Sequence, residues 1–168
     1  MDNREHLLRS AMFYGLMLGG FWLVKYAFFM IGIFYPLLYV VYLILTPLTL
    51  VFAYIFGRVY KILAGGEVGF FHAWQFGVLL YFFAALIVSL LHYVFYMYVA
   101  PESFLTDAFD ATSKMIINLS PQARDAIDNM PAITPIRMTI HGILNNIIYG
   151  IIFSIPVAAI TCRKKQKN

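Results

Sequence analysis

"WQFGVLLYFFAALIVSLLHYVFYMYV", from Trp74 to Val99, contains no Asp, Glu, Lys or Arg over its whole length. A helix that crosses the hydrocarbon core of a bilayer needs about 20 mostly apolar residues, so this stretch is long enough to span one. The whole chain shares this character, with 62% hydrophobic, 18% aromatic and 12% charged residues. A soluble chain of this composition would expose large apolar patches and aggregate. The sequence therefore predicts an integral membrane protein.

Three further stretches meet the same length criterion. The predicted fold is all-α, a single membrane domain over residues 1–168 with transmembrane helices at about 8–33, 36–56, 74–99 and 136–161. Pro36 separates the first two spans, because the residue before a proline disfavours the helical conformation. Nothing charged lies between Lys25 and Arg58, so the sequence leaves this boundary the least defined.

Basic residues in the short flanks of the spans predict the orientation, since Lys and Arg accumulate on the cytoplasmic side. With the N-terminus inside, the inner face holds Arg4, Arg9, Arg58, Lys61, Arg163, Lys164, Lys165 and Lys167. The outer face then holds Lys114, Arg124 and Arg137, with Glu102, Asp107, Asp110, Asp125 and Asp128. Both termini are therefore predicted to be cytoplasmic, and no basic patch with interleaved aromatics points to nucleic acid.

The outer segment 100–135, between the third and fourth spans, has a helical pattern. Phe104, Ala108, Ala111, Met115 and Leu119 recur at helical spacing. "SPQARDAIDNMP" then restarts a helix, because proline suits the first helical position. We expect two short amphipathic helices that lie on the outer membrane face or cap the bundle.

Small residues recur at every fourth position of two spans. They are Ala11, Gly15 and Gly19 in the first span, and Gly142, Gly150, Ser154 and Ala158 in the last, with the larger Asn146 in the same row. Lipid gives helices no hydrophobic reason to associate, so close contact through small residues drives packing. We predict that the first and last spans pack antiparallel along these ridges, with Gly15 and Gly150 the least tolerant of substitution. Chance and a self-association face are the alternatives.

Polar side chains inside the spans form a candidate intramembrane polar cluster. They are Lys25, His92, His141, Asn145 and Asn146. At 1.5 Å per residue, Lys25 lies about 22 Å from the inner end of its span, and His92 and Asn145 lie at about 27 and 24 Å. An ionisable group at such a depth is costly and suggests function. The alternative is structural, because lysine can reach the headgroups and asparagines can join helices.

Catalytic and cofactor motifs are absent from the sequence. There is no HExxH, GxSxG, Gly-rich phosphate loop or CxxC, and the spans hold no paired carboxylates. His6 and His72 stand alone in the sequence on the inner side, where single histidines are seldom metal ligands. We therefore expect no enzyme activity, no metal and no cofactor.

Several motifs carry a family resemblance over nearly the whole chain. "SAMFYGLMLGG", "GGEVGFFHAWQFG", "YVAPESF" and "PIRMTIHGILNNIIYGIIFSIPVAAI" follow one another in that order. With them the chain resembles the bacterial domain of unknown function 4199 family, small four-helix inner-membrane proteins. The resemblance implies a location in the bacterial cytoplasmic membrane. It also implies a genomic association with a polyprenyl-phosphate glycosyltransferase, and it brings no catalytic residues.

Two functions stay open at this point. The first is a non-enzymatic membrane subunit or scaffold that anchors or assists an envelope-biosynthesis partner, such as that glycosyltransferase. A basic inner face suits anionic lipid and an acidic partner. The alternative is a small transporter or flippase for a lipid or solute. Four helices form a thin wall for a pathway, so this alternative requires a homo-oligomer.

Overall fold

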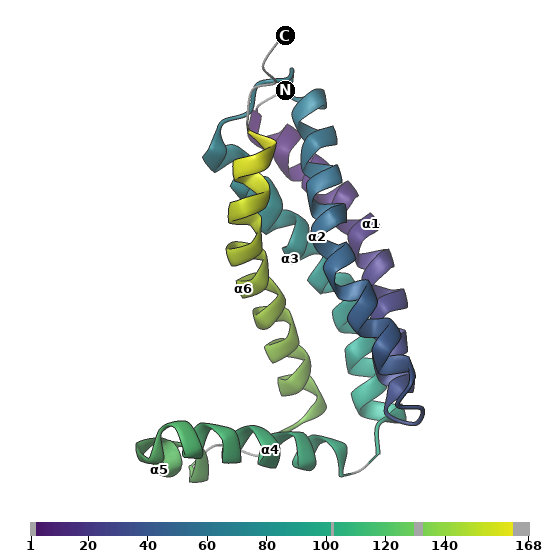
Figure 1. Cartoon of the computed structure of the whole chain (residues 1–168), viewed down its shortest axis with the longest axis vertical. Helices are drawn as coiled ribbons and strands as arrows, with labels where there is room; N and C mark the ends of the chain where they lie inside the picture. The colour runs from purple at the N-terminus through teal and green to yellow at the C-terminus, as the bar shows by residue number, and fades with distance from the viewer. Residues whose placement is uncertain (1–2, 102, 130–132, 163–168) are drawn as a thin grey trace.

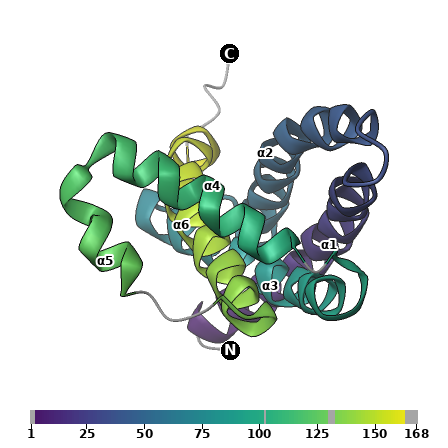
Figure 2. The same cartoon turned by 90° about the horizontal axis from the view of Figure 1, so that it is seen from below.

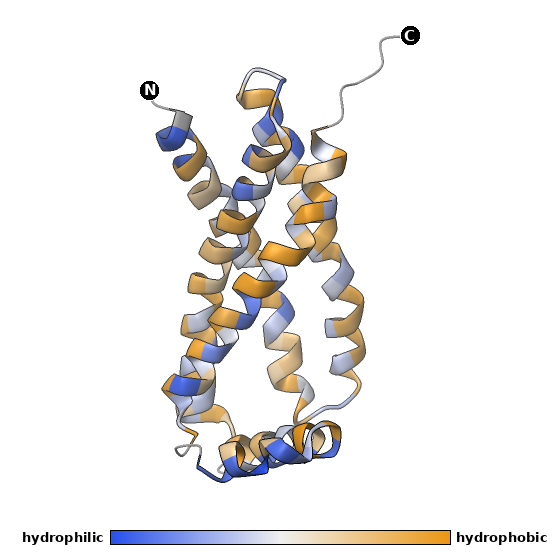
Figure 3. Ribbon diagram, turned by 90° about the vertical axis from the view of Figure 1, so that its left-hand side faces the viewer, coloured by the Kyte–Doolittle hydropathy of each residue, from blue (hydrophilic) through white to orange (hydrophobic). Residues whose placement is uncertain are grey.

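The computed structural model describes residues 3–101, 103–129 and 133–162, which are helical and include no strand. The four long helices are α1 (Asn3–Gly32), α2 (Leu38–Leu63), α3 (Phe70–Val94) and α6 (Pro135–Thr161). Each is long and apolar enough to cross a membrane, with a π-helical turn (Phe95–Val99) extending α3. Four long apolar helices at the predicted positions are confirmed, and Figure 3 shows many of their residues in orange, the hydrophobic end of its scale.

Two tight connections join the first three helices. Between α1 and α2 the amides of Phe34 and Tyr35 both bond to the carbonyl of Ile31, and Pro36 then begins the new direction. Between α2 and α3, Gly65 and Gly66 have φ values of 92° and 86°, which side chains disfavour. The second span therefore runs to Leu63, seven residues beyond the sequence-based boundary near Phe56. Neighbouring spans alternate in direction, and both termini lie at the same end (Figure 1).

The helix α3 is the centre of the bundle, with α1 and α6 packed on it. Leu80, Ala84 and Val88 line its interior positions and are at most 1% exposed. The prediction that the first and last spans pack on each other is wrong, because α3 lies between them and each ridge packs on α3 instead. Sequence spacing identifies a small-residue face but carries no information about which helix occupies it.

The segment between α3 and α6 crosses the far end of the bundle. It forms α4 (Phe104–Leu119), a 3-10 turn (Pro121–Ala123) and the short α5 (Arg124–Asp128). Figures 1 and 2 show α4 lying across the ends of the long helices, and Figure 2 shows α5 turning off at a large angle from the far end of α4. Met115 and Leu119 on α4 are 66% and 82% exposed, so the rest of the chain does not cover them.

Some predicted features lie outside the described residues. They are Glu102, the side chain of Ala108 and the basic residues Arg163, Lys164, Lys165 and Lys167.

Candidate functional site

Tyr26, itself partly buried, is the centre of a group of polar and aromatic side chains between the long helices, which we call the Tyr26 cluster. Its hydroxyl donates a hydrogen bond of 3.4 Å to Asn146 Oδ1 on α6. Its ring lies 4.5 Å from the His92 ring of α3 at an interplanar angle of 71°, an edge-to-face contact. On the α2 side it lies 5.8 Å from the Tyr42 ring. One side chain thus connects all four long helices.

Lys25 is 4% exposed and is surrounded by aromatic rings. Its Nζ lies 4.6 Å from the Tyr26 ring centroid, 5.3 Å from that of Trp22 and 5.4 Å from that of Tyr42. Cation–π attraction strengthens to about 2 kcal/mol when such a pair is desolvated. Among the described residues, no carboxylate forms an ion pair with this amine. Aromatic faces, and not an ion pair, therefore surround this amine.

The cluster continues towards both neighbouring layers. Trp22 Nε1 donates a 3.3 Å hydrogen bond to Thr49 Oγ1 of α2, and both residues are buried. In the other direction the His92 ring stacks on Tyr96, whose ring in turn stacks on Phe104 at the start of α4. The polar and aromatic groups of the cluster thus contact one another. The ring contact between Tyr96 and Phe104 joins the start of α4 to the end of α3.

The predicted polar residues separate into two groups. Lys25, His92 and Asn146 are buried and meet at Tyr26, with exposed fractions of 4%, 7% and 7%. His141 and Asn145 are exposed on another face of α6 and take no part in the cluster. The five residues therefore do not form one layer, because adjacent positions on a helix differ by about 100° in direction.

The predicted packing residues also divide. Ala11, Ser154 and Ala158 are at most 1% exposed, and Gly15, Gly19 and Gly150 are buried. A Cβ at Gly15 would lie 2.6 Å from Phe83 Cβ, and one at Gly150 would lie 2.6 Å from Tyr81 Cβ. At Gly142, by contrast, an added Cβ would meet nothing within 4 Å among the described residues. The close approach of α6 to α3 thus begins only after Gly142.

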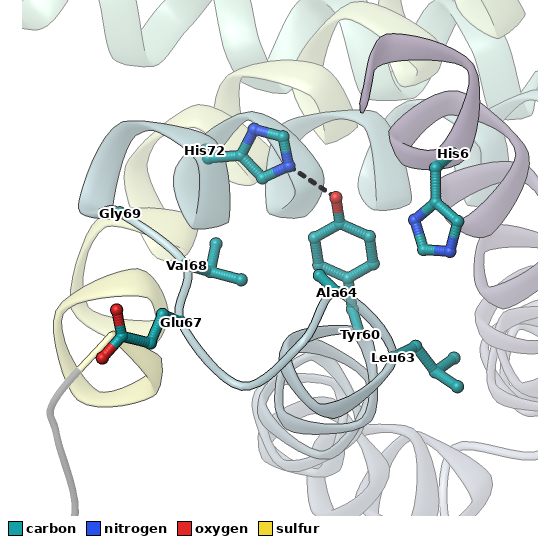
Figure 4. A pocket seen from close by; sticks show the side chains of 8 residues that line it. All are labelled: His6, Tyr60, Leu63, Ala64, Glu67, Val68, Gly69 and His72. Atoms are coloured by element: carbon teal, nitrogen blue, oxygen red, sulfur yellow. Dashed lines mark hydrogen bonds between the residues drawn. The ribbon is translucent and has the colours of Figure 1, made fainter. Parts of the chain in front are cut away.

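A second group of polar side chains lines an open groove at the end of the bundle where the termini lie, which we call the His6 groove. It combines a pocket of about 450 Å³ with a neighbouring cleft of about 350 Å³, and His6 and Leu63 line both. Figure 4 shows the Tyr60 hydroxyl bonded to His72 Nε2, with the His6 ring on the other side of Tyr60. The second cleft adds Arg9, Phe13 and Tyr14 from α1.

Tyr60 is a buried residue that lines the His6 groove. Its ring is 2% exposed and stacks on Phe76 at 4.3 Å and 6°. It also stacks on His72 at 5.7 Å and 17°. The two histidines that the sequence presents as isolated thus share one pocket, although the described residues contain no group of three His, Cys, Asp or Glu that could hold a metal.

The sequence gives only a weak indication of the Tyr26 cluster and of the His6 groove. Tyr26 follows Lys25 directly, but nothing in an apolar helix distinguishes a tyrosine in contact with three other spans from one at the interface. His6 and His72 lie within one turn of the start of α1 and α3, and Tyr60 lies within one turn of the end of α2, so all three are near the same end of the bundle. A comparison of depths would have indicated the groove, whereas the reasoning about each histidine by itself missed it.

The chain matches a known protein family. The family described as "Protein of unknown function (DUF4199)" matches residues 13–163, which cover both the Tyr26 cluster and most of the His6 groove. No curated protein and no solved structure matches the chain. The chain belongs to the DUF4199 family.

Proposed function

We propose that this member of the DUF4199 family is a non-catalytic membrane subunit or scaffold that anchors or assists a partner. The observation that carries the proposal is the closure of the Tyr26 cluster. Lys25, His92 and Asn146 are at most 7% exposed and contact rings or polar atoms of the bundle itself. A catalytic or transport residue has to reach its substrate, whereas these side chains hold helices together.

A transporter or flippase, the alternative, has less support. The polar layer that would line its path is divided, because His141 and Asn145 are exposed on a different face from the buried Asn146. A homo-oligomer could still form on the lipid-facing helices. Leu43, Ile44 and Ile62 on α2 are 63%, 63% and 68% exposed, and they suit either lipid or a second protein.

The membrane placement is part of the proposal. The chain would lie in the bacterial inner membrane with both termini in the cytoplasm, as the flanking Lys and Arg residues favour. In a Cys162→Ser background, an impermeant thiol reagent added outside should label Asp107→Cys and leave Glu67→Cys unlabelled. The reverse pattern would overturn the orientation.

The α4 helix would then lie along the outer membrane surface with Met115 and Leu119 towards the lipid. Asp110 and Lys114 are exposed on the same helix, so polar and apolar residues are both available to an interface.

The partner would be an envelope-biosynthesis enzyme, such as a polyprenyl-phosphate glycosyltransferase. Affinity isolation of the tagged chain from native membranes in a mild detergent should recover one partner in stoichiometric amount. A chain recovered alone from cells that express it at native level would count against the scaffold.

Paired variants separate the scaffold from the transporter. Lys25→Met and His92→Phe keep the approximate shape of each side chain and remove its polar function. In a scaffold, the double variant should retain both partner recovery and the cellular phenotype of the wild type. His141→Phe is the matched control, because it removes an intramembrane histidine outside the cluster. Loss of the phenotype in the double variant, with normal protein level and partner recovery, would support transport instead.

A further inference from the structure

We propose that the His6 groove binds the phosphate headgroup of an anionic membrane lipid, with the start of its acyl chain along Phe13 and Leu63. This inference is separate from the scaffold role and would stand without it. The groove differs from the Tyr26 cluster because it is open, lies near a membrane surface and contains polar groups that face outward.

The position of the groove matches a lipid headgroup. About 20 central residues of each span occupy the hydrocarbon core. Arg9 lies near the beginning of α1, Tyr60 near the end of α2, and His72 in the first turn of α3. All three therefore lie at the boundary between the apolar core and the headgroups, on the side of the chain termini (Figure 1).

The polar groups suit a phosphate. Arg9 is exposed, and within the described part of the chain its side chain has no hydrogen bond or ion pair. A guanidinium binds a phosphate through two parallel, charge-assisted hydrogen bonds. His6 lines the same cleft and offers a ring N–H. The Tyr60 hydroxyl is bonded to His72, which holds that imidazole at the back of the pocket.

The charge of this end of the bundle favours an anion. Among the described residues of this end, 3–10 and 58–72 carry four Lys or Arg against Glu5 and Glu67. Glu5 lines a neighbouring cleft beside Arg9. Figure 4 shows Glu67 across the pocket from His6, with its carboxylate directed away from Tyr60. The acids therefore border the groove and do not fill its centre.

The apolar wall identifies the lipid, and not free phosphate, as the ligand. Phe13 lies one helical turn beyond Arg9 towards the membrane centre and is 59% exposed. Leu63 faces the same cleft from α2 and is 57% exposed. A headgroup held by Arg9 and His6 would place its first methylenes against these two side chains. Each buried CH₂ adds about 0.8 kcal/mol, which an inorganic anion cannot supply.

Native mass spectrometry of the full chain in a neutral detergent tests the proposal. The probes are dioleoyl phosphatidic acid, dioleoyl phosphatidylglycerol, dioleoyl phosphatidylcholine and inorganic phosphate. We expect one phosphatidic acid or phosphatidylglycerol per chain, retained in preference to phosphatidylcholine. Equal retention of phosphatidylcholine would overturn the requirement for an anionic headgroup. Binding of inorganic phosphate as strong as that of phosphatidic acid would overturn the proposal that the ligand is a lipid.

Two charge-matched variants locate the site. Arg9→Gln should weaken retention of phosphatidic acid about tenfold, as expected for one charge-assisted hydrogen-bonding group. Arg58→Gln is the control, because it removes the same charge at the same end, where Arg58 bonds to Tyr54 outside the groove. Equal weakening by both would show a general charge effect and overturn the site.

Leu63→Glu tests the apolar wall, since it places a repelling carboxylate at an exposed wall position. Unchanged retention of phosphatidic acid in this variant would also overturn the proposal.

Discussion

The Tyr26 cluster and the His6 groove are built from the same residue types but differ in what surrounds them. Each contains a basic side chain, histidine, tyrosine and further aromatic rings. Lys25 in the cluster is 4% exposed and lies among three rings, whereas Arg9 in the groove is exposed to its surroundings. Residue type therefore does not distinguish a structural group from a binding group. The degree of enclosure distinguishes them, because the side chains of an enclosed group already contact one another and cannot reach a ligand.

The largest expected effect is at the centre of the enclosed region. Tyr26→Ala removes the hydrogen bond to Asn146, the ring contact with His92 and the nearest ring to Lys25. Tyr26 is partly buried, so its replacement by alanine should cost about 3 kcal/mol, the low end of the range for a fully buried large aromatic. We expect a loss of this size in the free energy of unfolding, measured by denaturation in mixed detergent micelles.

Tyr93→Ala is the matched control for this prediction. Tyr93 follows His92 on α3 but is 36% exposed, so its removal should cost less than about 1 kcal/mol. Similar losses in the two variants would show that the cluster contributes no more than any tyrosine in the spans. The distinction between the enclosed and the open region would then fail.

The second effect separates enclosed and open positions on a single helix. Gly150→Ala puts a methyl group 2.6 Å from Tyr81 Cβ on α3, so the two helices must move apart. Such overpacking costs about 1–3 kcal/mol. Gly142→Ala meets no described residue within 4 Å and should gain about 0.5–1 kcal/mol from the better helix propensity of alanine. Thermal unfolding in the same detergent measures both, and changes of the same sign would contradict the packing.

The spans could be predicted from the sequence because they depend on local composition. The apolar runs around Trp74–Val99 and their equivalents appear again as α1, α2, α3 and α6. The small-residue faces were also visible, since Gly15 and Gly150 recur at helical spacing. Their partner was not, because helix order in a bundle depends on contacts between distant segments. Hence both small-residue faces pack on α3, which the residue spacing in α1 and α6 does not indicate.

The candidate sites were predictable only in part, for a related reason. The polar residues could be placed at a depth, but their direction around each helix could not be fixed in an apolar sequence. Asn146 therefore meets Tyr26 while its neighbour Asn145 is exposed. In the His6 groove, His6, Tyr60 and His72 meet because the ends of α1, α2 and α3 that carry them lie side by side. None of the three residues indicates a site by itself.

The smallest effect is that of one substitution, Tyr→Phe, at a buried tyrosine beside Trp22 of the Tyr26 cluster and at one in the His6 groove, and its sign should differ between the two. Tyr81 is 2% exposed, and its hydroxyl has no hydrogen-bond partner among the described residues. Burying an unpaired hydroxyl is unfavourable, so Tyr81→Phe should raise the free energy of unfolding by about 1 kcal/mol. Tyr60 is equally buried, but its hydroxyl is bonded to His72. Tyr60→Phe should therefore lower the free energy of unfolding by about 1 kcal/mol, because it leaves the imidazole without that partner. Unfolding of both variants in one detergent measures the difference of about 2 kcal/mol. If Tyr81→Phe is destabilising as well, its hydroxyl has a partner in the membrane, and the core around α3 is less closed than its burial indicates.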